Sequence, residues 1–214
     1  LYMLYNLIVM NKRTTILELG SGWSTLIFFI AMNSLKNKFG KDVKKLRRNN
    51  PFEIFVLENS KKYLDITKKR INFFKKKLNL KNCPKVNYSF SNVDMELYEN
   101  KICTSFKKLP MCNPDFIYLD GPDQFNVKKD VNGISTRHLD MMPMSSDILK
   151  FEFFYTPGTL IICDGRSANA LFLKSFLKRN WHHKYDQVND QHIFYLKDPS
   201  LGKYNDLQLA FYKK

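Results

Sequence analysis

The chain has 214 residues, of which 44% are hydrophobic and 14% aromatic. This length fits one domain, and such a chain buries enough surface to fold without a disulfide or metal. Eighteen Phe and eleven Tyr exclude a disordered polymer, and no apolar run approaches the roughly 20 residues that span a bilayer. The net charge of +15 is uneven: residues 36–85 hold 17 basic and four acidic residues, which leaves 18 and 16 elsewhere.

We expect one cytoplasmic domain, with a lead-in segment at 1–13, a core at 14–197 and a tail at 198–214. Residues 1–10 are apolar but lack the basic region and cleavage site of a signal peptide. The chain opens on Leu1, so we expect further residues upstream. The four cysteines show no CxxC spacing, which favours free thiols in a reducing compartment over a zinc or redox site.

Strand-like and helix-like segments alternate along the chain. Apolar or β-branched runs bounded by turn residues predict strands at 14–19, 52–58, 85–90, 115–120 and 158–164. Apolar residues at helical spacing predict helices at 24–33, 60–80, 145–155 and 168–180. A hairpin around Asn189-Asp190 is expected to join strands at 183–188 and 191–197.

This alternation predicts parallel βαβ units with right-handed crossovers. The expected fold is an α/β, Rossmann-like three-layer sandwich. Its sheet is seven-stranded and mostly parallel, with the C-terminal hairpin as the antiparallel part. Ligands of such sheets bind beyond the carboxyl ends of the strands, so functional residues are expected there.

The first strand ends in a glycine loop that suits close approach to a ligand. The run Glu18-Leu19-Gly20-Ser21-Gly22-Trp23-Ser24-Thr25 has two glycines one residue apart, just before a helix whose first N–H groups are free. Thr25 stands where the dinucleotide-binding fingerprint has its third glycine. A simple tight turn is the alternative. Glu58 ends the second strand, where a carboxylate can accept two hydrogen bonds from a ribose diol.

These segments resemble the cofactor site of class I S-adenosylmethionine-dependent methyltransferases, among them the small-molecule and sugar O-methyltransferases. The resemblance is carried by ELGSGWST, by the strand ending in VLEN, by PDFIYLDGPD and by PGTLIICDGR, and it extends from about Thr14 to Lys197. It implies that S-adenosyl-L-methionine is the cofactor. The cofactor contacts that it implies are Glu18, Gly20, Ser21 and Gly22 at the methionine part, Glu58 at the ribose, Asn59 beside the adenosine, Ser91 and Asn92 at the adenine, and Asp120.

Methyl transfer to a hydroxyl needs positioning, exclusion of water and a base. Candidate groups cluster between the fourth strand and Pro143, namely Asp120, Asp123, Asp130, Arg137, His138 and Asp140. We expect the catalytic residue to be Asp120, Asp123 or His138. His138 is a candidate base because the unperturbed pKa of histidine lies near neutrality. Arg137 and Arg166 are candidate contacts for the acceptor. An ordinary solvated residue is the alternative for a loop histidine such as His138.

Asp120 and Asp164 end adjacent predicted strands, as two metal ligands do in the catechol-type and macrolide sugar O-methyltransferases. Gly165 stands at the position of the third family ligand, and Arg166 follows it. We therefore expect no bound metal.

The expected function is methylation of a small-molecule or glycan hydroxyl. Methylation of RNA or protein through the basic stretch 36–85 is one alternative, and a non-catalytic nucleotide- or lipid-binding module is another. Nucleic acid is less favoured because Asn113-Pro114-Asp115-Phe116, the nearest approach to a base-methylation motif, opens the fourth strand instead of closing it.

Overall fold

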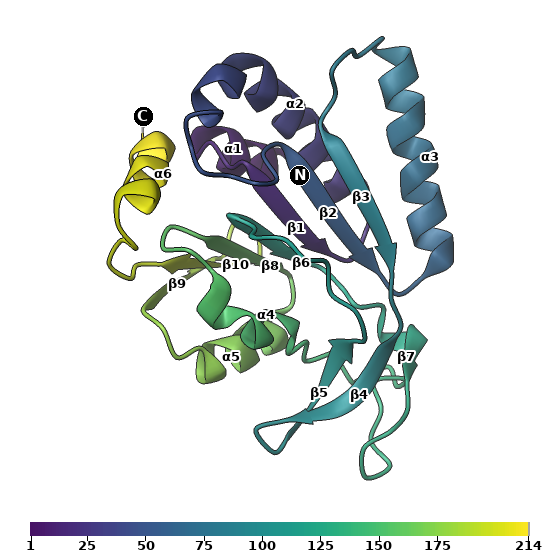
Figure 1. Ribbon diagram of the computed structural model, residues 1–214. Helices are drawn as coiled ribbons and strands as arrows, with labels where there is room; N and C mark the ends of the chain where they lie inside the picture. Colours follow the sequence, from purple (N-terminus) through teal and green to yellow (C-terminus); the bar gives the residue numbers. More distant parts are fainter. Residues whose placement is uncertain (214) are drawn as a thin grey trace.

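A seven-stranded sheet forms the middle layer of the molecule (Figure 1). The computed structural model describes residues 1–213. The strand order is β3-β2-β1-β6-β8-β10-β9. The strands are β1 Thr15–Leu19, β2 Glu53–Glu58, β3 Lys85–Phe90, β6 Phe116–Leu119, β8 Leu160–Asp164, β9 Trp181–Asp186 and β10 Gln191–Leu196. The first five are parallel, and β10 runs antiparallel to both β8 and β9, which confirms the expected α/β sheet.

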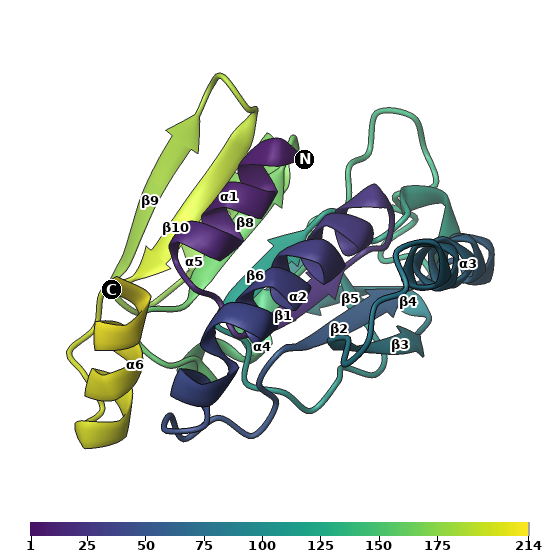
Figure 2. The same cartoon turned by 90° about the horizontal axis from the view of Figure 1, so that it is seen from above.

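Helices cover both faces of this sheet (Figures 1 and 2). They are α1 Tyr2–Met10, α2 Trp23–Val43, α3 Lys61–Lys77, α4 Asp147–Lys150, α5 Ser167–Phe176 and α6 Lys203–Lys213. Alternate residues of β1 serve the two faces, because side chains along a strand point to opposite sides. Ile16 packs in the core under α1, α2 and α3, whereas Leu17 and Leu19 pack in the core with α4 and α5.

A second, three-stranded sheet packs on the α4–α5 side of the molecule. It consists of β4 Val93–Tyr98, β5 Lys101–Phe106 and β7 Val127–Lys128, in the order β5-β4-β7. Val93, Met95 and Phe106 bury apolar surface in the same core as α4 and α5. β4 and β5 are not among the strands predicted from the sequence.

Several boundaries differ from the sequence-based expectation. The helix expected at 24–33 continues to Val43, because Leu35 and Val43 are also buried along it. The helix expected at 145–155 is the four-residue α4 followed by a 3₁₀ segment at Glu152–Phe154. The lead-in segment contains α1 and the tail contains α6. None of the helices within residues 1–213 combines the length and the apolar character that crossing a bilayer requires.

The direction in which successive strands are added to the sheet reverses between β1 and β6. It builds β2 and β3 on one side of β1 and then crosses to β6 and β8 on the other. Ligands of open α/β sheets bind at such a switch point, beyond the carboxyl ends of the strands. A ligand site is therefore expected at the loops after β1, β2, β6 and β8.

Candidate functional site

A cavity of about 350 Å³ lies at the carboxyl ends of the parallel strands. Four strand-end loops and the start of α3 line this carboxyl-edge cavity. Its lining residues are Gly20, Ser21, Glu58, Tyr63, Asp120, Gly121, Asp123, Gln124, Phe125 and Arg166. Six residues that the sequence singled out are thus brought together here: Gly20, Ser21, Glu58, Asp120, Asp123 and Arg166.

Two glycines let the loops after β1 and β6 touch through their backbones. Gly20 has a φ of +112°, and a Cβ built on it would lie 3.0 Å from the Gly121 nitrogen. A Cβ on Gly121 would lie 2.8 Å from the Gly20 nitrogen. Gly20 thus meets the positive φ that glycine tolerates and also makes room for the neighbouring loop. Gly22, in contrast, has an extended backbone and caps α2, and a Cβ built on it would make only an ordinary contact with Ser24 Oγ at 3.9 Å.

The Glu58 carboxylate joins the glycine loop to the start of α3. Its Oε2 accepts a hydrogen bond from the Ser21 hydroxyl at 2.7 Å, and its Oε1 accepts one from the Ser60 amide at 2.8 Å. Burial raises the pKa of Glu58, while the bonds from Ser21 and Ser60 lower it. A carboxylate offers about four lone-pair sites, so acceptor capacity remains on the cavity side.

Glu18 lies beneath the glycine loop and holds the first turn of α2. Its two oxygens accept hydrogen bonds from Ser24 Oγ at 2.5 Å and Thr25 Oγ1 at 2.7 Å. Burial raises the pKa of Glu18 to about 8, against the lowering effect of both hydroxyls. Glu18 is absent from the cavity lining. The position of Glu18 gives Thr25 a role after the glycine loop, because the Thr25 hydroxyl donates a hydrogen bond to the Glu18 carboxyl group.

Asp120 and Arg166 meet at the β6–β8 side of the carboxyl-edge cavity. Arg166 donates from Nη2 to the Asp120 carbonyl at 2.7 Å, and its Nε lies 3.8 Å from Asp120 Oδ1. The Asp120 side chain is 47% exposed. Desolvation raises the pKa of Asp120 to about 6, Arg166 lowers it, and Asp164 and Glu58 raise it. This carboxyl therefore changes charge close to neutral pH.

Asn59 fixes the start of the loop that follows β6. Its side-chain amide donates to the Asp123 carbonyl at 3.1 Å and accepts from the Asp123 amide at 3.0 Å. The Asp123 carboxylate in turn accepts bonds from the Phe125 amide and the Asn126 side chain, which begins a 3₁₀ turn. Asn59 thus ties the end of β2 to the loop after β6.

Ser91 and Asn92 follow β3 and lie outside the lining of the carboxyl-edge cavity. The buried Ser91 donates its amide to the Glu58 carbonyl, and its hydroxyl oxygen accepts from the Lys108 amide. The side chain of Asn92 is exposed. Neither residue lines the cavity itself, and Ser91 reaches it only through the backbone of Glu58.

Arg137 and His138 lie on the outer part of the long loop, away from the cavity lining. Arg137 pairs with Asp130 and donates to the Val127 carbonyl, so its guanidinium is held within the loop. The His138 ring is mostly exposed, and its Nδ1 accepts from the Asp140 amide. His138 is linked to the cavity through its carbonyl, which accepts a hydrogen bond from the Gln124 side chain.

Asp164 does not face Asp120 as a free carboxylate. Its oxygens accept hydrogen bonds from the Tyr118 hydroxyl at 2.5 Å and the Gln191 side chain at 2.8 Å. Within residues 1–213, no group of three or more His, Cys, Asp or Glu side chains is arranged to hold a metal ion.

Four residues of the cavity lining were not among the candidates from the sequence: Tyr63, Gly121, Gln124 and Phe125. Tyr63 falls within the helix predicted at 60–80, and about half of its surface is exposed. It lies three residues after Ser60, whose hydroxyl caps α3, so it belongs to the first turn beside the strand end. Gly121 stands within the run PDFIYLDGPD, whereas no motif in the sequence includes Gln124 or Phe125.

Comparison with known proteins gives weak structural matches. No family model matches the chain, and no curated protein matches it. An O-methyltransferase from Bacillus cereus, solved in complex with SAH, is 18% identical over 92% of this chain and 79% of its own, with a TM-score of 0.44. A methyltransferase-like protein from Silicibacter pomeroyi is 13% identical over 99% and 92%, with a TM-score of 0.46. Human methyltransferase-like protein 13, solved with SAH, is 12% identical over 98% and 84%, with a TM-score of 0.37. At these values the matches assign no function to this chain.

Proposed function

We propose that this chain is an S-adenosylmethionine-dependent methyltransferase. The observation that carries the proposal is the meeting of three features at one cavity: the glycine loop after β1, Glu58 at the end of β2 and Asp120 after β6. The cavity lies at the switch point of the sheet, where this fold class binds ligands.

The charges around the carboxyl-edge cavity favour a cation over a pyrophosphate. Three acidic residues, Glu58, Asp120 and Asp123, line it against one basic residue, Arg166. A dinucleotide carries two negative phosphates, which these carboxylates would repel. S-Adenosylmethionine instead carries a sulfonium and an ammonium group, and both are attracted by them.

The donors and acceptors present suit this cofactor. Glu58 lines the cavity and would accept hydrogen bonds from a ribose diol. Gly20 and Ser21 line it as well, and with Gly22 beside them they would contact the methionine part. Glu18 supports that loop from below through α2. Asn59 shapes the adenosine side by holding the Asp123 backbone, with Ser91 and Asn92 farther along that edge.

The bound cofactor would supply an activated methyl group, and the chain would supply position and a proton acceptor. Asp120 is the preferred base, because it is half exposed at the cavity and its pKa of about 6 leaves it ionised at neutral pH. Asp123 is second, since its oxygens are already engaged in the 3₁₀ turn. His138 could act only if the outer loop approached through its link to Gln124.

The preferred acceptor is a hydroxyl of a small molecule or glycan. Tyr63 and Phe125 present half-exposed aromatic rings at the cavity, which suit the apolar face of a sugar or another ring. Arg166 could pair with an anionic group of the acceptor. RNA and protein are the other acceptor candidates. Many of the lysines of the basic stretch surround a hollow at the C-terminal half of α2, whereas the cavity lies at its N-terminal end. Because α2 has 21 residues, it is about 30 Å long, and its length separates these lysines from the cavity.

A thermal-shift panel tests the proposal. S-Adenosylmethionine and S-adenosylhomocysteine should each stabilise the protein, by about 2.7 kcal/mol at 100-fold excess over Kd, whereas NAD should not. Stabilisation by NAD alone would contradict it. Incubation with methyl-tritiated cofactor and RNA distinguishes the two acceptor classes. Stoichiometric incorporation of label into RNA would show that RNA, and not a small molecule, is the acceptor.

A further inference from the structure

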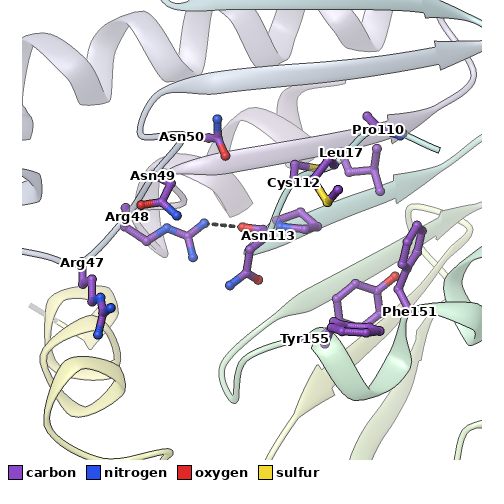
Figure 3. Close-up of a pocket in the computed structure, with 13 residues that line it drawn as sticks. Leu17, Arg47, Arg48, Asn49, Asn50, Pro110, Cys112, Asn113, Phe151 and Tyr155 are labelled. Atoms are coloured by element: carbon purple, nitrogen blue, oxygen red, sulfur yellow. Dashed lines mark hydrogen bonds between the residues drawn. The ribbon is translucent and has the colours of Figure 1, made fainter.

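A second cavity, of about 430 Å³, lies at the opposite end of the sheet. It is formed by three segments that each precede a parallel strand: residues 47–50 before β2, 110–114 before β6 and 151–155 before β8. We call it the amino-edge cavity, and Figure 3 shows it. It shares no lining residue with the carboxyl-edge cavity, so it is a separate site. Its volume falls in the range of small-molecule pockets.

Two buried donors at this cavity lack partners. The Arg48 side chain is 3% exposed. Its Nη2 donates to the Asn113 carbonyl at 2.7 Å, whereas its Nε has no hydrogen-bond partner among the described residues. Tyr155 is 2% exposed, and its hydroxyl likewise has none. Figure 3 shows Tyr155 across the cavity from Leu17 and Cys112. Buried polar groups are nearly always satisfied, so two such donors at one cavity call for a ligand that accepts hydrogen bonds.

The charge at the amino-edge cavity is positive. Arg47 and Arg48 line it, and no acidic side chain does. Arg48 lies 3.7 Å from the buried Asp115, which also faces the buried Arg13. One carboxylate thus faces two buried guanidinium groups. A buried charge without full compensation is costly, and an anionic ligand would relieve that cost.

The rest of the lining is apolar. Leu17, Pro110 and Phe151 supply the walls, and Met111 and Phe154 at the rim are among the most exposed large hydrophobic residues of the chain. Exposed apolar side chains grouped at a concave site mark ligand-binding surfaces.

We propose that the amino-edge cavity is a second ligand site, which binds a small organic acid. Its carboxylate would accept hydrogen bonds from the Arg48 and Tyr155 donors, and its ring or short apolar body would lie against Leu17, Phe151 and Phe154. The site is independent of the methyltransferase proposal, because it uses none of the residues of the carboxyl-edge cavity.

Calorimetry with 1-naphthoate as probe tests the site, with 1-naphthalenemethanol as its uncharged analogue. We expect saturable binding of naphthoate with a Kd of about 1 mM or tighter, as ordinary ligand efficiency gives for 13 non-hydrogen atoms, and at least tenfold weaker binding of the alcohol. Tyr155→Phe should weaken naphthoate about 3–10-fold. That variant should fold normally, because it removes a hydroxyl that has no partner. Tyr88→Phe is the matched control: it also removes an unpartnered buried hydroxyl, but one outside the cavity, and should leave the affinity unchanged.

Thiol protection locates the probe. In a Cys83→Ser background, Cys112 is the one cysteine that is not fully buried, and it lines the amino-edge cavity. Saturating naphthoate should slow its modification by methyl methanethiosulfonate at least fivefold, whereas S-adenosylhomocysteine should not. Equal affinity for the acid and the alcohol, an unchanged affinity in Tyr155→Phe, or no protection of Cys112 would each overturn the proposal.

Discussion

At the scale of single residues, Glu58 is the group whose removal best tests cofactor binding. Its buried carboxylate accepts hydrogen bonds from Ser21 and Ser60, and the residue lines the carboxyl-edge cavity. Glu58→Ala should weaken S-adenosylhomocysteine binding by about 1.5–3 kcal/mol, the scale of a hydrogen bond to a charged group. Isothermal titration measures the loss.

Ser21→Ala is the control for Glu58→Ala, because it removes the bond from the glycine loop but leaves the carboxylate in place. Its effect on affinity should be the smaller of the two. A ribose contact also predicts that wild type binds adenosine more tightly than 2′-deoxyadenosine and that Glu58→Ala narrows the difference. Wild-type affinity in Glu58→Ala would refute the assignment of the ribose site.

Asp120 should make cofactor discrimination depend on pH. Its pKa of about 6 lies above the ordinary value of 3.8, so the carboxyl is largely neutral at pH 5 and ionised at pH 7. The ionised form attracts the sulfonium of S-adenosylmethionine, which S-adenosylhomocysteine lacks. The ratio of the two affinities should therefore shift toward S-adenosylmethionine by about tenfold as pH rises through 6, which corresponds to about 1.4 kcal/mol.

Asp120→Asn should remove this pH dependence, and Asp123→Asn should keep it, because the Asp123 oxygens are engaged in the 3₁₀ turn. Calorimetry at pH 5, 6 and 7 provides the comparison. A flat ratio in the wild-type protein would place the sulfonium away from Asp120.

At the scale of elements, Glu18 links β1 to α2 and should affect stability in a defined pH window. Its pKa of about 8 in the folded chain exceeds the reference value of 4.5. Between these values the folded chain holds a proton that the unfolded chain releases, so wild-type stability should fall as pH rises from about 5 to 8. The slope from this group reaches at most about 1.4 kcal/mol per pH unit.

Glu18→Gln keeps an acceptor for the Ser24 and Thr25 hydroxyls but does not titrate. Urea unfolding across pH 5–8.5 should show wild type losing stability relative to this variant. Glu99→Gln, which changes an exposed glutamate, should follow the wild-type profile. Parallel profiles for wild type and Glu18→Gln would mean that Glu18 is already ionised in the folded chain.

The parallel strands could be predicted within one or two residues. Four of them are short buried apolar runs ended by turn residues, whereas β3 is a more polar, partly buried strand at the edge of the sheet. The second sheet could also have been recognised. Val93, Met95 and Leu97 alternate with polar residues, and Glu99-Asn100 forms the tight turn with both φ angles positive, at 45° and 61°. The extension of α2 to Val43 was hidden because its lysines obscured the spacing of Leu35, Phe39 and Val43.

The residues of the candidate site likewise fall into some that the sequence predicts and some that it does not. Gly20, Glu58, Asp120 and Arg166 sit directly at strand ends, so topology alone brings them together. Arg137 and His138 lie on a loop whose path depends on contacts such as the pair of bonds between Asn59 and Asp123. Such long-range contacts leave no periodic pattern in the sequence.

At the scale of the whole molecule, Asp115 gathers segments from both ends of the chain. It is fully buried just before β6 and accepts hydrogen bonds from the Thr14 and Thr15 amides and from the Tyr212 hydroxyl of α6. Its ion pair with Arg48 adds the segment before β2. The C-terminal tail and the start of β1 are thus held together through one carboxylate.

Asp115→Asn should therefore be among the most destabilising single substitutions in the chain. It leaves Arg48 without its counter-charge, and it places an amide NH2 group opposite N–H and O–H donors. Breaking a buried ion pair typically costs about 3–5 kcal/mol of stability. Urea unfolding gives the value, with Asp65→Asn as an exposed control that should change little. Because Tyr212 is one of its donors, Tyr212→Phe and Asp115→Asn should be strongly non-additive in a double-mutant cycle. Additive losses would show that α6 is anchored by its apolar contacts alone, and that the carboxylate does not couple the two ends of the chain.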